Sequence, residues 1–229
     1  MQVSLIVFDM AGTTVTDKGA VAQAFVQAFK DLNHTVAVTE VNPLMGYKKN
    51  EAIRIILERL EVADITPALI DDIHSRFVNH MLNYYRTSPD IQALPEAETV
   101  MQHLKSKGIQ VGLDTGFSKD IADVIVDRLG WKQKGLIDYV VASDEVPAGR
   151  PHPYMIRKMM EAAGITDPLQ VVKVGDTEVD INEGKNAGCR YSIGVTTGAF
   201  TREELMPYEP SHIIDNLQEL LPILEPNYV

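Results

Sequence analysis

Hydrophobic and polar positions follow two different periods along this chain of 229 residues. Short apolar runs rich in β-branched residues are typical of buried strands, whereas apolar residues at i, i+3 and i+4 spacing are typical of amphipathic helices. The runs predict strands at 5–9, 109–113, 139–142, 170–174 and 191–195. The helical period occurs between and after them, at 96–108, 119–129, 153–164, 180–188 and 216–224. Repeated strand–helix units predict an α/β fold with a Rossmann-like, doubly wound parallel sheet.

One part of the chain breaks this alternation. Helical spacing recurs at 20–32, 48–60 and 67–85, with no run typical of a strand between these segments. Successive helices predict an all-helical cap at 15–88, inserted into a core made of 1–14 and 89–229. Both connections of the cap flank the end of the first strand, so a cap mounted there can close over a ligand and exclude water.

Polar residues follow four of the predicted strands. In chain order they are Asp9, Thr115 with Gly116, Arg150, and Asp176 with Asp180. Because the carboxyl ends of parallel strands meet at one edge of the sheet, we expect these side chains to lie close together. Carboxylates, a hydroxyl group with neighbouring amides, and a cation are what phosphoryl transfer through an aspartyl-phosphate requires.

The carboxylates are the candidate nucleophile and metal ligands. Asp9 is the expected nucleophile. Mg²⁺ prefers oxygen ligands, so Asp9, the main-chain carbonyl near Ala11 and Asp176 are its expected ligands. We expect Asp180 to support this site from behind the metal ligands or to reach the metal through water.

The remaining groups are candidate phosphoryl-binding residues. Thr115 and the amides at and after Gly116 can bind phosphoryl oxygens at a helix N-terminus. Arg150 can neutralise the same group and pair with a carboxylate. Taken singly, Thr115 and Gly116 also fit an ordinary helix start, and Arg150 also fits an exposed turn. The order of all these groups along the chain favours the functional interpretation.

Composition excludes several classes of function. The chain is 45% hydrophobic and 23% charged, as is typical of globular proteins. Its net charge of −11 argues against a nucleic-acid partner, so an anionic ligand would need a local cation. The single cysteine, Cys189, excludes an internal disulfide. We find no signal peptide or membrane-spanning pattern and expect a cytoplasmic protein without a membrane partner, as a monomer or a homodimer.

The four motifs resemble those of the haloacid dehalogenase superfamily of hydrolases. The resemblance rests on the turn that follows Asp9, on Thr115, on Arg150, and on the Gly-Asp-Thr segment 175–177 with Asp180 after it. It spans nearly the whole chain with the motifs in the right order. It implies a Rossmann-like core with a helical cap inserted after the first motif, and a Mg²⁺-dependent hydrolase.

Ala11 indicates which branch of the superfamily the chain resembles. Most phosphatases of the superfamily have an aspartate at this position, which protonates the alkoxide leaving group, and its loss costs a phosphatase roughly two to four decades of rate. The phosphonatase branch similarly has alanine there, breaks a carbon–phosphorus bond, and uses a cap lysine that forms a Schiff base. Segment 45–53 is similar to its Met-Gly-x-x-Lys segment, which implies Lys49 as that lysine and makes Met45 a candidate substrate contact. Helical spacing also places Lys49, and not Lys48, at the head of an apolar stripe.

Two positions depart from the phosphonatase pattern. Ala52 stands where those enzymes have a histidine, and Phe117 where they have a tyrosine. Segment 194–200 is more similar to capped phosphatases of the phosphoglycolate type. We therefore expect a hydrolase of phosphonoacetaldehyde or a similar small phosphonate. The alternatives are a phosphatase of a small phosphorylated metabolite and a binding protein that retains the metal site.

Overall fold

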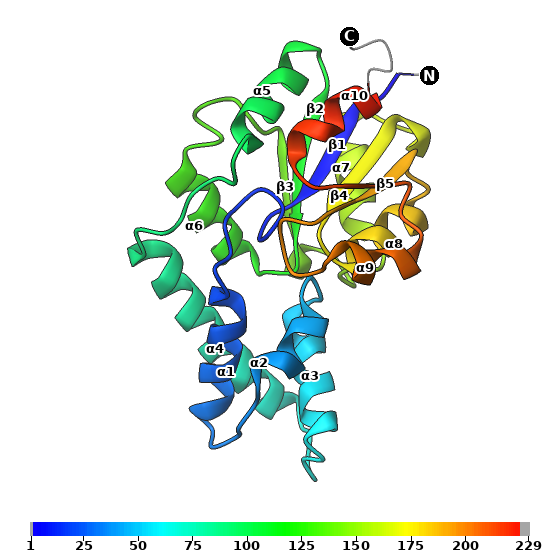
Figure 1. Cartoon of the computed structure of the whole chain (residues 1–229). Coiled ribbons are helices and arrows are strands. Elements are labelled where there is room, and N and C mark those ends of the chain that lie inside the picture. The colour runs from blue at the N-terminus through cyan, green and yellow to red at the C-terminus, as the bar shows by residue number, and fades with distance from the viewer. Residues whose placement is uncertain (1, 225–229) are drawn as a thin grey trace.

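Parallel strands form the centre of the computed structural model, which describes residues 2–224 (Figure 1). In that range the strands are β1 Leu5–Asp9, β2 Gln110–Thr115, β3 Tyr139–Ala142, β4 Val171–Gly175, β5 Tyr191–Val195 and β6 His212–Ile214. They form one six-stranded sheet in the order β3-β2-β1-β4-β5-β6. The five predicted strands are all present, which confirms the α/β, Rossmann-like fold. Strand β6 was not predicted because it is three residues long and begins at an exposed histidine.

The register of the central strands aligns their carboxyl ends. Asp9 at the end of β1 pairs with Asp114 near the end of β2. On the other side of β1, Phe8 pairs with Val174 of β4, one residue before that strand ends at Gly175. The residues that follow these strands therefore emerge next to one another at a single edge of the sheet.

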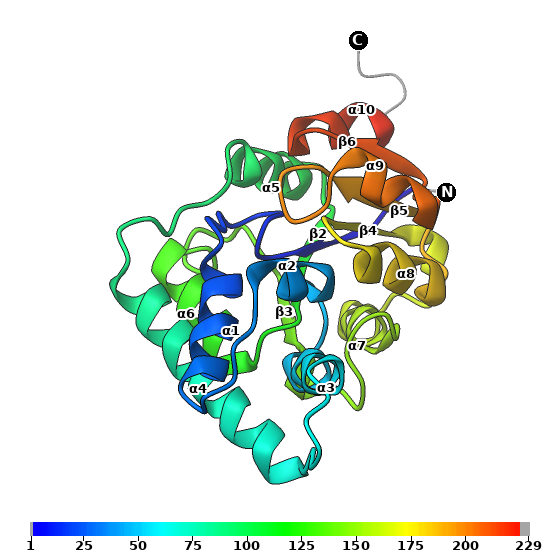
Figure 2. The same cartoon turned by 60° about the horizontal axis from the view of Figure 1, so that its bottom comes forward.

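Helices cover both faces of the sheet, as a doubly wound fold requires. They are α5 Ala97–Ser106, α6 Lys119–Leu129 and α10 Leu220–Leu224 on one face, and α7 Tyr154–Ala163 and α8 Glu178–Ala187 on the other (Figure 2). Side chains of β1 alternate between these layers. Leu5 and Val7 pack in a cluster with Met155 of α7, whereas Ile6 and Phe8 belong to the larger cluster that contains α5 and α6.

A group of helices lies below the sheet in Figure 1. They are α1 Ala20–Lys30, α2 Val38–Val41, the 3₁₀ helix Asn42–Leu44, α3 Lys49–Arg59 and α4 Pro67–Thr87. Phe25 of α1 and Phe77 of α4 pack with ring centroids 4.5 Å apart. The three long helices follow the predicted periodicity. Helix α2 and the 3₁₀ helix were not predicted, because one turn is too short to show a period.

The two connections to this helical group run side by side. The amide of Thr16 donates to the carbonyl of Gln92 at 3.0 Å, and the amide of Leu94 donates to the carbonyl of Thr14 at 2.8 Å. The chain thus leaves the sheet and returns to it at one place, next to the end of β1. The remaining short elements are α9 Arg202–Leu205 and 3₁₀ helices at Ser143–Glu145, Pro168–Gln170, Met206–Tyr208 and Leu217–Glu219. Among the described helices, none combines the length and apolarity needed to cross a bilayer.

Candidate active site

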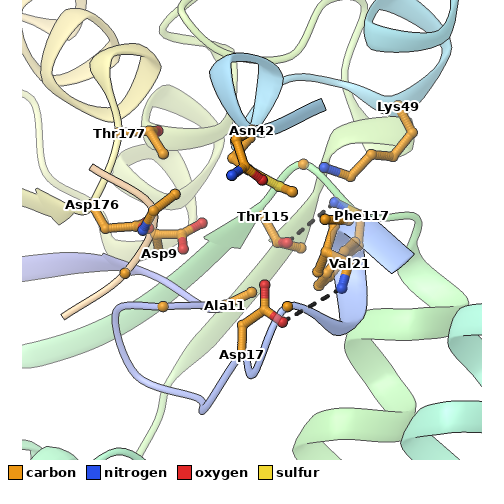
Figure 3. A pocket seen from close by; sticks show the side chains of 18 residues that line it. Asp9, Ala11, Asp17, Val21, Asn42, Lys49, Thr115, Phe117, Asp176 and Thr177 are labelled. Atoms are coloured by element: carbon orange, nitrogen blue, oxygen red, sulfur yellow. Dashed lines mark hydrogen bonds between the residues drawn. The ribbon is translucent and has the colours of Figure 1, made fainter. Parts of the chain in front are cut away.

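A cavity of about 240 Å³ lies between the carboxyl ends of the strands and the helical group (Figure 3). Seven of the site residues predicted from the sequence line it: Asp9, Ala11, Met45, Lys49, Thr115, Gly116 and Asp176. Two others, Arg150 and Asp180, do not. They lie behind the cavity wall and contact the residues that form it.

Arg150 binds the carboxylate of Asp9 from the side that faces away from the cavity. Its guanidinium group is fully buried and donates to Asp9 Oδ1 at 2.6 Å and to Asp180 Oδ1 at 2.5 Å. The expected pairing of this arginine with a carboxylate is therefore present. Because Arg150 does not line the cavity, the geometry favours a positioning role over the direct phosphoryl contact expected from the sequence.

Asp180 also lies behind the cavity wall. Its Oδ1 accepts from Arg150 and lies 3.0 Å from Nζ of Lys173, and its Oδ2 accepts from the hydroxyl of Thr177 at 2.5 Å. Every carboxylate oxygen of Asp180 is thus engaged by the protein. This geometry leaves Asp180 behind the proposed metal ligands and does not favour a direct contact between Asp180 and a metal ion.

Lys173 lies behind the cavity wall and was not predicted from the sequence as part of the site. It is fully buried in β4, hydrogen-bonded to Asp114, and 3.4 Å from Glu183. Burial favours its neutral form, but the surrounding carboxylates outweigh burial and raise the pKa of Lys173 above the ordinary lysine value. A signal for it existed in the sequence, because a lysine in the middle of an apolar strand requires buried acidic partners.

The cavity walls offer a place for a divalent cation between Asp9 and Asp176. Burial raises the pKa of Asp9 to about 6, and burial together with the negative charge of Asp9 holds the pKa of Asp176 well above its usual range. Within 2–224, Asp176 has no cationic partner at ion-pair distance. Two carboxylates that destabilise each other's charge fit a bound Mg²⁺, which removes this repulsion.

A second acidic cluster is a poorer metal site. Asp9, Asp114 and Asp180 can place one oxygen each within 4.8 Å of one another. The cations of Arg150 and Lys173 already lie among these oxygens and pair with them. An additional cation would have to displace them.

The loop after β5 fixes Asp176 and was not identified as part of the site. The amide of Ala199 donates to Asp176 Oδ2 at 2.6 Å, and the hydroxyl of Thr197 donates to the carbonyl of Gly12 at 2.7 Å. A Cβ atom on Gly198 would lie 1.9 Å from Asp176 Oδ2, so only glycine fits between them. In sequence this loop has no residue with obvious chemistry, which is why it was overlooked.

The segment before α3 rests directly on the core. A Cβ atom on Gly116 would lie 2.5 Å from the carbonyl oxygen of Tyr47, and one on Gly46 would lie 2.5 Å from Thr177 Oγ1. Gly46 also has a φ of +82°, which favours glycine. The hydroxyl of Tyr47 donates to Glu178 at 2.7 Å across the same contact. These contacts close the cavity on the side of Lys49.

Lys49 points into the cavity from the first residue of α3, opposite Asp9 (Figure 3). It is only 4% exposed, and its Nζ lies 5.6 Å from the ring centroid of Phe25 and 5.2 Å from that of Phe117. Among the described residues, no carboxylate lies within ion-pair distance of this amine. Burial, with a contribution from the positive charge of Arg150, lowers the pKa of Lys49 to about 8. In a useful fraction of the protein molecules, the amine of Lys49 is therefore neutral and nucleophilic near neutral pH.

The family model for haloacid dehalogenase-like hydrolases matches residues 6–194. The chain belongs to this family. Its hydrolase relatives include the phosphonoacetaldehyde hydrolase of Bacillus cereus (strain B4264), which is 30% identical over 226 residues, covering 90% of this chain and 81% of that protein. The phosphonoacetaldehyde hydrolase of Parabacteroides distasonis is 34% identical over 213 residues, covering 86% and 78%.

Solved structures agree on the fold. A phosphonoacetaldehyde hydrolase-like protein from Oleispira antarctica superposes with a TM-score of 0.86 at 23% identity, covering 99% of this chain and 92% of that one. A predicted phosphoglycolate phosphatase from Haemophilus somnus superposes with a TM-score of 0.79 at 21% identity, covering 97% and 98%. At these identities the structures support the haloacid dehalogenase-like fold, and the choice between substrates depends on the residues of the site.

Proposed function

We propose that this hydrolase cleaves the carbon–phosphorus bond of phosphonoacetaldehyde, or of a similar small phosphonate that carries an aldehyde. The observation that supports this most is Lys49. A buried amine without an ion-pair partner among residues 2–224, with a pKa lowered to about 8, shares one cavity with the candidate nucleophile Asp9. Hydrolysis of a phosphate ester does not need a neutral, nucleophilic amine, whereas an aldehyde substrate forms an imine with one.

The alanine at position 11 supports the same choice. Ala11 lines the cavity two residues after Asp9, and its side chain cannot donate a proton to a leaving group. Cleavage of an ester needs such a proton, because an alkoxide is a poor leaving group. A carbanion whose electrons pass into an iminium ion does not need it. The proposed reaction therefore fits the residue that is present.

The proposed sequence of steps uses both ends of the cavity. The neutral amine of Lys49 adds to the aldehyde carbon, and loss of water leaves a protonated imine. Asp9 then attacks phosphorus, the carbon–phosphorus bond breaks, and its electron pair neutralises the iminium nitrogen to give an enamine. Water hydrolyses the aspartyl-phosphate to release phosphate. Protonation of the enamine carbon and hydrolysis of the imine release the aldehyde product and restore the amine.

Several residues orient the phosphoryl group in this proposal. Arg150 keeps Asp9 in place, and the amide of Phe117 donates to Thr115 Oγ1 at 3.1 Å, which fixes that hydroxyl on the cavity wall. Asp9, Asp176 and the carbonyl of Ala11 would hold Mg²⁺, since no described backbone hydrogen bond uses this carbonyl. A bound Mg²⁺ supplies charge neutralisation between the carboxylates and the incoming phosphonate.

Phosphate release from phosphonoacetaldehyde in the presence of Mg²⁺ tests the proposal. Lys49→Ala should lose this activity, because the iminium ion formed by this amine is the electron acceptor. Lys48→Ala is the matched control: the neighbouring lysine does not line the cavity, and its variant should keep the activity of the unaltered protein. Equal activity of the Lys49→Ala and Lys48→Ala variants would refute the role of the amine.

The variants Asp9→Asn and Lys49→Ala distinguish the proposed activity from the alternative one. If the protein is instead a phosphatase of a small phosphorylated metabolite, phosphate release from a panel of monoesters should disappear in Asp9→Asn and persist in Lys49→Ala. The shared fold with phosphoglycolate phosphatases is the basis for including 2-phosphoglycolate in that panel.

A further inference from the structure

Asp17 presents a carboxylate to the cavity that the proposed steps do not use. It lies in the connection between β1 and α1. One of its oxygens accepts from the amides of Ala20 at 2.7 Å and Val21 at 3.4 Å, and so caps α1. Figure 3 shows the other oxygen directed into the cavity, which Lys49 also lines, and the charges of Asp17 and Lys49 interact.

The imine chemistry requires proton transfers that the other cavity residues cannot supply. Among the described residues, the titratable side chains that line the cavity are Asp9, Asp17, Lys49 and Asp176. Asp9 attacks phosphorus, Lys49 is the amine, and Asp176 is a proposed metal ligand. Asp17 is the group that remains.

The residues next to the amine of Lys49 offer no other group that could transfer a proton. Ala52 lies one turn after Lys49 on α3, and Phe117 packs against the amine from the core. Neither side chain can carry a proton. His74 of α4 is electrostatically coupled to Lys49 but does not line the cavity.

The surroundings of Asp17 make its carboxylate more basic than that of a free aspartate. Burial raises the pKa of Asp17 above the ordinary aspartate value, while the capping amides and the charge of Lys49 oppose this shift. The phenol of Tyr85, on α4, also interacts electrostatically with Asp17. Lys18, the adjacent residue, is exposed and paired with Asp90.

We propose that Asp17 is the general acid–base catalyst for imine formation and hydrolysis at Lys49, an inference that rests on the proposed aldehyde substrate. When the amine has added to the aldehyde, Asp17 as a carboxylate takes a proton from nitrogen, and solvent water supplies a second proton to the alkoxide oxygen to give a carbinolamine. Asp17 as an acid then gives the proton that it took from nitrogen to the hydroxyl group. The carbon–oxygen bond breaks, water leaves, and the nitrogen lone pair forms the protonated imine.

A purely structural role would be to cap α1. The variant Asp17→Asn distinguishes the two roles, because an asparagine oxygen caps a helix about as well as an aspartate oxygen but cannot transfer this proton. The matched control is Asp64→Asn, which makes the same chemical change at an exposed position away from the cavity.

The experiment measures the rate at which borohydride fixes phosphonoacetaldehyde to the protein, followed by mass spectrometry across a range of pH. Asp17→Asn should form the adduct about 10²-fold more slowly than the unaltered protein, with the same melting temperature, and Asp64→Asn should match the unaltered protein. Added acetate should restore part of the rate in Asp17→Ala, which leaves space for a carboxylic acid. A structural role predicts no such rescue.

Two failures can be told apart. If the unaltered protein forms the adduct and Asp17→Asn forms it at the same rate with the same pH dependence, the role of Asp17 is refuted and the proposed function stands. If the unaltered protein forms no adduct, the aldehyde chemistry and the role of Asp17 are both refuted.

Discussion

Burial of Lys49 as a cation opposes folding, so replacing Lys49 by Met should raise the free energy of unfolding. Methionine has a similar length, lacks the charge, and packs well against the rings of Phe25 and Phe117 that surround the amine. The amine has no ion-pair partner among the described residues to offset its burial. A gain in stability on removing an active-site residue is expected where a site is built for chemistry.

The magnitude follows from the pKa of this lysine. Burial lowers the pKa of Lys49 from 10.5 in the unfolded chain to about 8 in the folded protein. Because each pKa unit is equivalent to about 1.4 kcal/mol, the charged form destabilises the folded state by about 3 kcal/mol at pH 7. Between pH 8 and pH 10.5 the unfolded state binds more protons than the folded state, so this opposition weakens as the pH rises. The gain in Lys49→Met should therefore fall to about 2 kcal/mol at pH 9.

Urea unfolding of the metal-free protein at pH 7 and pH 9 measures this effect. Lys48→Met is the matched control, since Lys48 precedes α3 and does not line the cavity, and it should show neither the gain nor its pH dependence. A Lys49→Met variant that is less stable than the unaltered protein, or whose gain is the same at both pH values, would show that this lysine is not held in an environment that disfavours its charge.

Three further substitutions test the surrounding site. Asp9→Asn should lower phosphate release roughly 10⁴–10⁶-fold in a steady-state assay, because the nucleophile is lost; a smaller loss would exclude an aspartyl-phosphate. Lys173→Met leaves Asp114 buried without its hydrogen-bonded cation and should lower the free energy of urea unfolding by about 3–5 kcal/mol. Gly198→Ala places a Cβ atom 1.9 Å from Asp176 and should raise the half-saturating Mg²⁺ concentration roughly tenfold or more; an unchanged value would place the metal elsewhere.

The fold could be predicted because its signals are local. A buried parallel strand is a short apolar run, and a long amphipathic helix repeats its period several times. The bounds predicted at 119–129, 139–142 and 191–195 agree with the structure. Short elements such as β6 and α2 contain too few residues for a period, so their positions depend on contacts with distant parts of the chain.

The cavity residues that follow the strands could also be predicted, because motifs at the ends of parallel strands converge by topology. The roles of the residues behind the cavity wall could not be predicted. Whether Arg150 reaches a ligand or only the back of Asp9 depends on side-chain packing, and so does the enclosure of Asp180 by Lys173 and Thr177. Asp17 was missed for a related reason, since a helix-capping aspartate looks the same in sequence whether or not its second oxygen faces a cavity.

The most direct test of the account is the mass of the protein after borohydride treatment with phosphonoacetaldehyde and Mg²⁺, with the modified peptide identified. We expect an ethyl group on Lys49 in the unaltered protein, because the carbon–phosphorus bond breaks before the imine is reduced. In Asp9→Asn we expect a phosphonoethyl group on the same lysine, because the imine forms but the bond stays intact. An unmodified Lys49, or the same adduct in both proteins, would contradict the proposal that this amine and Asp9 act on one substrate.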